Sequence, residues 1–423
     1  MTRVAVVGGG WAGMAAAVEL AERGVPVTVF EAARQLGGRA RGVAVNGLVL
    51  DNGPHLLLGA YRETLRLLEK VRPGPLPLLR LPLHLEIPGA FRLHLPSLPA
   101  PLHLAVGLLT ARGVNWKERL AAARFMESLK RLRFRLEQDT TVDALLRLHG
   151  QHGAPSRHLW EPLCLAALNT PPAKASAQVF LNVLRDSLAG SRDACDMLLP
   201  ETDFTALFPA PAADYVRRRG GEVRLSCPVR AISKEGSGYA LTTDGGSEIF
   251  SHVVCAVPPQ RLPALLAGLP ELAGTAKTAA GFRHQPIYNV YLQYPPGTRL
   301  SQPLLGMAGG LGQWVFDRGW THGQDGLMAV TLSGEGAHEK LGQDELAATV
   351  ARELAPLIGS ATPLWHRVVA DKRATFACTP AISRPKGETA LPGLVLAGDY
   401  VEGDYPATLE GAVRSGVAAA RRL

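Results

Sequence analysis

The sequence predicts an α/β fold built on a parallel sheet, and three observations near its start carry this prediction. Val4 to Val7 is a short apolar run rich in β-branched residues, as expected of a buried strand. Residues 14–23 are rich in alanine and predict a helix that Gly24 ends. Residues 27–30 predict a second buried strand. A strand, a helix and a strand in this order are typical of a βαβ unit with parallel strands.

A glycine-rich turn joins the first strand to the helix. Gly8, Gly10 and Gly13 form the pattern G-x-G-x-x-G at this junction. Gly8 permits the tight turn, Gly10 lets the backbone approach a pyrophosphate, and Gly13 lets the helix pack closely on the strand. The pyrophosphate would lie against the free N–H groups of the helix N-terminus, at Trp11 and Ala12. The pattern therefore predicts a Rossmann-like dinucleotide-binding domain.

The residues after the second strand distinguish between dinucleotides. Glu31 falls at the C-terminal end of that strand, where a carboxylate accepts the ribose hydroxyls of adenosine and repels a 2′-phosphate. Both NAD and FAD sites share this feature. A second glycine pair, Gly37 and Gly38, is followed by Arg39, and this arrangement suits the pyrophosphate and isoalloxazine side of a flavin. We therefore expect FAD as the cofactor.

The opening stretch resembles the flavin amine oxidase and phytoene desaturase superfamily, whose members carry a double-glycine arginine motif just after the ribose-binding acid. Four further blocks are similar to the squalene-associated family of FAD-dependent hydroxysqualene dehydroxylases: residues 51–64, 160–171, 180–187 and 398–413. The resemblance implies reduction of hydroxysqualene to squalene in bacterial hopanoid or related terpenoid synthesis. It also implies a polyprenyl substrate, and upstream squalene-pathway synthases as partners.

The resemblance extends to cofactor contacts. The chain lacks the C-terminal cysteine to which some amine oxidases tether FAD, so binding should be noncovalent. Asp399 is expected to contact the ribityl or pyrophosphate side of the cofactor. The further residues expected at FAD are Gly53, Pro54, His55, Val229, Gly398, Thr408 and Leu409.

The distribution of these motifs predicts a discontinuous domain organisation. A Rossmann-like FAD-binding domain of residues 1–71, 211–262 and 384–423 would be interrupted by an α+β substrate domain of residues 72–210 and 263–383. Eight prolines between residues 73 and 101 favour edge strands and irregular connections there.

Length and composition further restrict the class of protein. A chain of 423 residues is long enough for two domains with substantial cores. It has no uninterrupted apolar run long enough to span a bilayer, and its first strand begins too early to leave room for a signal peptide, so we expect a cytoplasmic protein. The five cysteines form no C-x-x-C pattern, and neither they nor the histidines predict a metal. No nucleic-acid-binding motif is present, so nucleic acid is not expected as a partner.

Residues 98–135 contain an unusual charge pattern. An apolar stretch of residues 98–109 and Trp116 are followed by a strongly basic run with only Glu118 and Glu127 as acids. This order suits a segment that rests in a membrane interface, on the inner face of the cytoplasmic membrane. The alternative is an ordinary helical hairpin with a solvated basic face. The basic residues are Arg112, Lys117, Arg119, Arg124, Lys130, Arg131, Arg133 and Arg135.

Removal of an allylic hydroxyl requires a proton on the leaving oxygen and a hydride at the same carbon. His55 is the first candidate proton donor, because a loop histidine beside the flavin segment can titrate near neutrality. Asp51 would orient it. Tyr61, Tyr291 and Tyr405 are the next candidates. The alternatives are that His55 only hydrogen-bonds the flavin or the backbone and that the tyrosines belong to the core.

Three functional interpretations remain open from the sequence. The chain is a flavin reductase of a polyprenyl alcohol, a carotenoid-type desaturase or amine oxidase that removes electrons, or a flavin-binding scaffold attached to a membrane synthase complex. The direction of electron flow is not encoded in these motifs. Glu410, at the start of the last helix, is expected to favour the helix dipole and to have no other role.

Overall fold

The computed structural model describes residues 2–360 and 362–423. Its first sheet contains five parallel strands in the order β10–β2–β1–β14–β20. In this order their bounds are Glu222–Arg224, Val27–Phe30, Val4–Val7, His252–Cys255 and Leu394–Leu396. These strands come from three distant parts of the chain, and all three parts were predicted to contribute to the FAD-binding domain.

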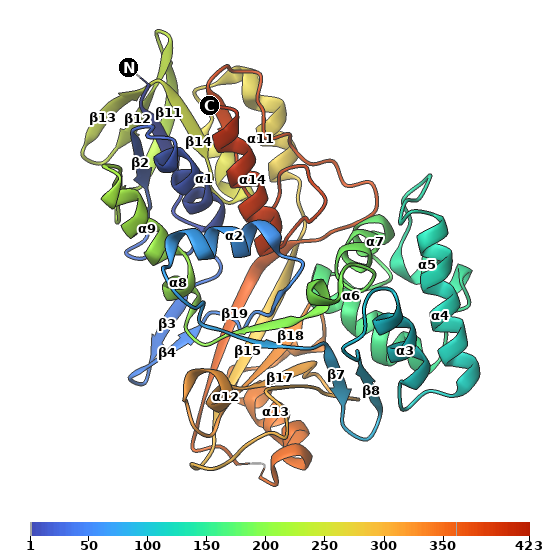
Figure 1. Cartoon of the computed structure of the whole chain (residues 1–423). Helices are drawn as coiled ribbons and strands as arrows, with labels where there is room; N and C mark the ends of the chain where they lie inside the picture. The colour runs from blue at the N-terminus through green and yellow to red at the C-terminus, as the bar shows by residue number, and fades with distance from the viewer. Residues whose placement is uncertain (1, 361) are drawn as a thin grey trace.

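Helices cover this sheet and are themselves closely packed. Helix α1 (Trp11–Glu22) is buried along almost its whole length and packs against α14 (Leu409–Arg421) and α9 (Pro209–Arg218). The approach of α14 to α1 is so close that a Cβ on Gly416 would lie 2.1 Å from the carbonyl oxygen of Ala12. Helix α2 (Arg62–Val71) contacts α14 and α9. Figure 1 shows these helices, with both chain termini, at one end of the molecule.

A smaller antiparallel sheet adjoins the first one. It consists of β11 (Val229–Glu235), β12 (Gly238–Thr243) and β13 (Gly246–Phe250), and β12 contacts β14. A hairpin turn at Asp244–Gly245 joins β12 to β13. Two short helices follow β14: α10 (Leu262–Leu265) and α11 (Ala273–Ala280).

The second large sheet is antiparallel, with the order β16–β17–β18–β15–β19. Its strands, in that order, are Leu304–Gly306, Trp314–Asp317, Leu327–Ser333, His284–Gln293 and Trp365–Phe376. Helix α13 (Gln343–Ile358) packs on it through a buried apolar cluster that contains Val290, Val330 and Val350. Helix α12 (Arg318–His322) follows β17 directly. In Figure 1 the long strands β15 and β19 extend from this sheet towards the end of the molecule where α2 and α14 lie.

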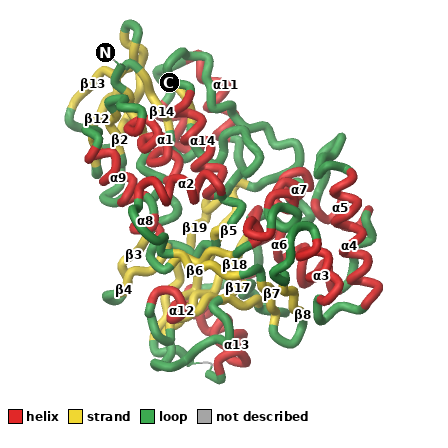
Figure 2. Tube along the Cα trace, in the orientation of Figure 1, coloured by secondary structure: helices red, strands yellow, loops and turns green. Residues whose placement is uncertain are grey.

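The remaining elements connect these two sheets and extend to one side. The Asn46–Gly47 turn closes the hairpin of β3 (Gly42–Val45) and β4 (Leu48–Asp51). The proline-rich region forms short strands at sheet edges. Figure 2 shows the helices α3 to α7 gathered on the side of the molecule opposite to β3 and β4. The bounds of these strands and helices are β3 Gly42–Val45, β4 Leu48–Asp51, β5 Leu57–Leu58, β6 Leu78–Leu81, β7 His84–Ile87, β8 Phe91–His94, β9 Met197–Pro200, α3 Leu102–Thr110, α4 Trp116–Arg131, α5 Val142–Leu148, α6 Glu161–Leu168, α7 Ala177–Asp186 and α8 Phe204–Leu207.

The predicted architecture of a Rossmann-like domain with α+β insertions is confirmed. The domain boundaries themselves remain a prediction, and several contacts cross them. Leu50 of β4, predicted to belong to the FAD-binding domain, is buried against Tyr291, Leu327 and Ala329 of the second sheet. The loop after β4 therefore starts at the junction of the two sheets.

Candidate functional site

The glycine-rich turn forms a cradle at the C-terminal edge of the first sheet. Gly8 has φ +112°, and a Cβ on Gly13 would lie 1.9 Å from the carbonyl oxygen of Gly8. The tight turn and the close helix packing predicted for these positions are therefore present. A Cβ on Gly10 would meet only the Cα of Gly38, at 3.8 Å, so the two glycine-rich segments face each other. These backbone surfaces fit a pyrophosphate.

The N-terminus of α1 supplies hydrogen-bond donors to this cradle. The first helical hydrogen bond runs from the Met14 N–H to the Gly10 carbonyl, at 2.9 Å. The preceding amides, including those of Trp11 and Ala12, have no acceptor within the helix. The Trp11 side chain, however, turns into the core, where its indole N–H donates to the Ala40 carbonyl at 3.1 Å. Only the backbone of Trp11 is therefore suited to the cofactor role predicted for it.

Glu31 lies directly beside the cradle. Its Oε2 accepts a hydrogen bond from the Gly9 N–H at 2.7 Å, and its Oε1 accepts one from the Ala33 N–H, also at 2.7 Å. Each carboxylate oxygen retains a further lone pair for a ribose hydroxyl. The Cys227 N–H donates to the Glu31 carbonyl at 2.9 Å, which holds the segment leading to Val229 next to this strand end.

Arg39 and Asp399 form an ion pair that joins the start and the end of the chain. Asp399 is buried, and the Arg39 Nη1 also donates to the carbonyl of Ala374 in β19, at 2.8 Å. Gly398, with φ +152°, donates its N–H to the Ser415 Oγ of α14 at 2.7 Å. The predicted residues Arg39, Gly398 and Asp399 therefore converge beside the glycine cradle.

Tyr400 is a residue that the sequence interpretation missed. Its side chain is buried, and its hydroxyl has no hydrogen-bond partner within residues 2–360 and 362–423. Burial raises the pKa of this hydroxyl far above its usual range, and the charge of Asp399 adds to the shift. A neutral, unpaired hydroxyl next to Asp399 is costly unless a ligand supplies its partner. Together with the glycine cradle, it indicates that the residues at this site fit a dinucleotide such as FAD.

The N-terminus of α14 completes this group. The Thr408 Oγ1 accepts a hydrogen bond from the Gly411 N–H at 3.0 Å, and Leu409 is the first helical residue. Glu410 has a different role from the one expected. Its Oε2 accepts from the Thr64 N–H at 3.0 Å and its Oε1 from the Glu63 N–H at 3.1 Å. Glu410 thus caps the neighbouring helix α2 and does more than favour its own helix dipole.

The loop that follows β4 forms hydrogen bonds with the segment of residues 39–41 on one side and with the second sheet on the other. The Asn52 Oδ1 accepts from the Arg41 N–H at 3.1 Å, and its Nδ2 donates to the Arg39 carbonyl. On the other side, the Asn289 Nδ2 donates to the Asn52 carbonyl at 3.0 Å. A Cβ on Gly53 would lie 2.7 Å from that same Nδ2. Asn289, which the sequence interpretation missed, therefore determines where Gly53 lies.

Pro54 and His55 complete this loop. The His55 ring packs edge to face on Phe204, with 4.9 Å between the ring centroids. Burial lowers the pKa of His55 to about 4, so the imidazole is neutral at pH 7. This pKa does not agree with the expectation that His55 titrates near neutrality.

The structure also corrects the expectation that Asp51 orients His55. The Asp51 Oδ1 accepts from the Phe204 N–H at 2.9 Å, and its Oδ2 accepts from the Arg318 Nη1 at 3.0 Å. Burial raises the pKa of Asp51 to about 6, although Arg318 opposes the shift. Asp51 thus serves a buried ion pair at the junction of the two sheets.

The three candidate tyrosines occupy different environments. Tyr291 is fully buried, and its hydroxyl donates to the Asp51 carbonyl at 2.7 Å, so the interpretation as a core residue replaces the catalytic one. Tyr61 is half-buried at the start of α2, where burial raises its pKa. Tyr405 is also half-buried, and the Arg414 guanidinium lies 4.5 Å from its ring centre. Tyr61 and Tyr405 remain candidates.

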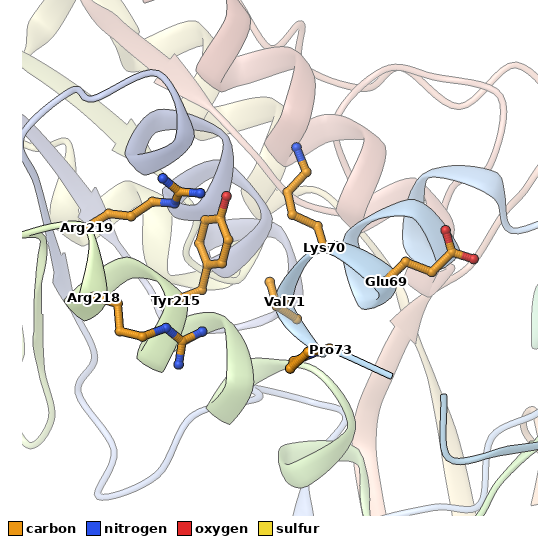
Figure 3. A pocket seen from close by; sticks show the side chains of 7 residues that line it. All are labelled: Glu69, Lys70, Val71, Pro73, Tyr215, Arg218 and Arg219. Carbon is orange, nitrogen blue, oxygen red and sulfur yellow. The ribbon is translucent and has the colours of Figure 1, made fainter. Parts of the chain in front are cut away.

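A depression of about 500 Å³ on the outer surface lies away from the cradle (Figure 3). Lys70, on its rim, pairs with Glu22 at the C-terminal end of α1, whereas the glycine cradle is at the N-terminal end. None of the predicted site residues lines it. Its lining residues are Glu69, Lys70, Val71, Pro73, Tyr215, Arg218 and Arg219.

Within the part of the chain that the structure describes, no cluster of histidine, cysteine or acidic side chains is arranged to hold a metal ion. All five cysteines are unpaired, and four of them are buried.

Comparisons with known proteins agree with this site. Residues 11–423 match the family described as flavin containing amine oxidoreductase. Hydroxysqualene dehydroxylase from Sinorhizobium fredii is 30% identical over 432 residues, which cover 99% of this chain and 97% of that protein. The protein of the same name from Rhodopseudomonas palustris is 30% identical over 445 residues, with 99% and 97% coverage. A probable zeta-carotene desaturase from Synechococcus elongatus is 23% identical, with 100% and 98% coverage.

Among solved structures, cyclohexylamine oxidase from Brevibacterium oxydans is similar with a TM-score of 0.72 and 19% identity, over 99% of this chain and 98% of that one. This similarity supports the fold. The family match spans nearly the whole chain and includes Gly13 of the glycine-rich turn, the Arg39 segment and the C-terminal block. The protein is therefore an FAD-dependent oxidoreductase that belongs to the family of flavin-containing amine oxidoreductases.

Proposed function

We propose that this protein reduces hydroxysqualene to squalene in bacterial hopanoid or related terpenoid synthesis. The observation that carries the proposal is the 30% identity, over almost the full length of both chains, to hydroxysqualene dehydroxylases from two organisms. The reaction breaks the allylic C–O bond and forms a C–H bond at the same carbon, and the oxygen leaves as water after it takes up a proton. Bound FAD, in its reduced form, supplies the hydride.

The protein's own residues would bind the cofactor and orient its reactive end. The glycine cradle, Glu31 and the Arg39–Asp399 pair would hold the dinucleotide, and the loop of residues 52–55 would lie at its reactive end. One continuous buried apolar cluster joins Cys255 and Tyr400, at the end of the first sheet, to Phe125 and Trp160 among the helices. A polyprenyl chain that reached this apolar part of the molecule would be compatible with it, and water would be excluded from a developing allylic cation there.

The direction of electron flow is tested by adding hydroxysqualene anaerobically to photoreduced enzyme. A hydroxysqualene reductase should reoxidise its flavin on this addition, with squalene formed in proportion. A desaturase or amine oxidase, the alternative favoured by the full-length similarity to zeta-carotene desaturase, should leave the reduced flavin unchanged. An oxidised enzyme that is instead bleached by an amine or a polyene would establish that alternative. A scaffold would show neither half-reaction.

We further propose that the α3–α4 hairpin rests on the anionic inner face of the cytoplasmic membrane. Upstream squalene-pathway synthases would deliver the substrate there. The hairpin packs inwards through Leu108, Phe125 and Leu129, yet it leaves apolar residues on its outer side. Trp116 is 67% exposed and Leu102 is 53% exposed. No helix in residues 2–360 and 362–423 is long and apolar enough to cross a bilayer.

Vesicle sedimentation should show this contact. A variant with Lys130, Arg131, Arg133 and Arg135 changed to glutamine should bind anionic phospholipid vesicles more weakly than the wild type, because each cation near such a surface contributes about 1 kcal/mol. A control removes three cations at the end of α9 by changing Arg217, Arg218 and Arg219 to glutamine. Equal binding by both variants, or no binding by the wild type, would favour a solvated hairpin.

A further inference from the structure

The loop of residues 52–55 follows directly after a buried ion pair, Asp51 with Arg318, which has no role in the proposed reaction. The Arg318 Nη1 and the Asp51 Oδ2 are 3.0 Å apart, and each side chain is only 2% exposed. Asp51 is the last residue of β4. Arg318 is the first residue of α12, which lies between β17 and β18 of the second sheet. The pair therefore bridges the two layers immediately before the loop predicted to contact FAD.

Asp51 is held from three directions. Besides Arg318, its carboxylate accepts the Phe204 N–H of α8, and its backbone carbonyl accepts the Tyr291 hydroxyl of β15. A residue fixed by its side chain and its backbone together leaves the next residues little freedom. Asn52 and Gly53 then take their positions from Asn289.

Arg318 is likewise fixed by several partners. Its Nε donates to the Gln324 Oε1, and its Nη2 donates to the Val49 carbonyl at 3.4 Å. Gln324 also donates to that carbonyl, at 2.9 Å. The planar guanidinium thus contacts β4 at Val49 and Asp51 simultaneously, which a lysine ammonium cannot reproduce.

The neighbouring His322 does not supply a second cation. Its Nε2 lies 3.9 Å from the Asp51 Oδ2, and burial together with the charge of Arg318 lowers its pKa to about 3. Arg318 is therefore the cation that neutralises Asp51, and a buried carboxylate without such a partner is strongly unfavourable.

We infer that Arg318, through its ion pair with Asp51, is a positioning residue that fixes the loop of residues 52–55 against the flavin. The inference rests on the proposed function only in assigning this loop to the reactive end of FAD. Arg318 touches neither the predicted cofactor residues nor the reacting atoms. It acts through Asp51, and its effect is on the placement of Gly53, Pro54 and His55.

The test uses the full-length flavoprotein and the double variant Asp51→Asn/Arg318→Met, which removes the ion pair without leaving an unpaired buried charge. The introduced asparagine amide can still accept the Phe204 N–H, so we expect a folded protein. The control is Glu19→Gln/Arg66→Met, which removes another ion pair of the FAD end, one that does not contact the loop. If the double variant fails to fold, Arg318→Lys is measured in its place. This substitution keeps the positive charge and loses the guanidinium hydrogen bonds to Val49 and Gln324.

The readouts are the visible circular dichroism of the flavin and the rate at which sulfite bleaches the oxidised flavin, measured beside the melting temperature. We expect the sulfite rate of the double variant to change by about tenfold or more, since a displacement of about 1 Å at a reactive centre costs up to about 10²-fold. The control should keep the wild-type rate. Sulfite rates that are equal in both variants, or that simply follow the melting temperature, would overturn the inference.

Hydroxysqualene is then added to the photoreduced forms. At saturating substrate the double variant should reoxidise its flavin more slowly than the control. The maximal rate constant of reoxidation should fall, whereas the substrate concentration that gives half of this maximum should stay the same. If the wild type is not reoxidised by hydroxysqualene, the proposed function fails, whereas the sulfite comparison still tests the positioning role of Arg318.

Discussion

Glu31→Lys is expected to abolish measurable FAD binding. The substitution removes two charge-assisted hydrogen bonds to the ribose, each worth about 1.5–3 kcal/mol, and places a cation where only acceptors are useful. At about 1.4 kcal/mol for each tenfold change, the loss corresponds to roughly 10²–10⁴-fold in the dissociation constant. The structure adds a second cost, because Glu31 also accepts the Gly9 and Ala33 amides that shape the cradle.

A fluorescence titration of the apoprotein with FAD measures this effect. The matched control is Glu22→Lys, the same change at the opposite end of α1, where Glu22 pairs with Lys70 on the surface. Glu22→Lys should keep the wild-type affinity. If Glu31→Lys also bound FAD with unchanged affinity, Glu31 would be only a residue at a strand end and the predicted ribose contact would be lost.

The first sheet was predictable because its signals are local. Gly8 and Gly13 are required by a turn and by a helix contact within ten residues of each other, and the strands on either side are short, apolar and fully buried. A sequence pattern encodes such features directly. The same holds for the Asn46–Gly47 turn, where both residues adopt positive φ.

The contacts that complete the site depend on the fold and have no local signal. Glu410 was assigned to its own helix, yet it caps α2, which is more than three hundred residues away in the sequence. Asn289 lies in β15 and Arg318 is the first residue of α12, and nothing near them in the sequence marks their contacts with β4 and the loop after it. Each acquires its role only when the two sheets are brought together.

Tyr291 shows why residue type alone could not decide between a catalytic role and a core role. A tyrosine hydroxyl is a plausible proton donor anywhere in a flavin site, and the sequence cannot tell which hydroxyls are already paired. The fold buries Tyr291 and directs its hydroxyl proton to the Asp51 carbonyl, so the same hydroxyl stabilises the loop. Tyr400 is the converse case, because its hydroxyl is buried without a partner in residues 2–360 and 362–423 and was not singled out.

His55→Ala is expected to retain FAD and, at a pH near the His55 pKa of about 4, to lose about 10²–10⁴-fold in the single-turnover reoxidation of flavin by hydroxysqualene, the range for a positioned general acid. The control is His252→Ala, which removes a histidine of β14 that bonds Ser251. Loss of FAD together with activity would instead identify His55 as a cofactor contact. A rate within a few-fold of the wild type would remove His55 from the mechanism and leave Tyr61 and Tyr405 as candidates.

The pH dependence of that rate identifies the acid. A group that must be protonated to act supports the reaction below its pKa, and its contribution is lost as the pH rises through that value. With the pKa of His55 lowered to about 4, a rate carried by its imidazolium should fall about tenfold per pH unit above pH 4, and this slope should vanish in His55→Ala. A break near pH 6 that persists in His55→Ala would implicate Asp51, whose pKa is raised to about 6. The pKa of about 6 already includes the opposing effect of Arg318, so such a break is expected with the ion pair closed.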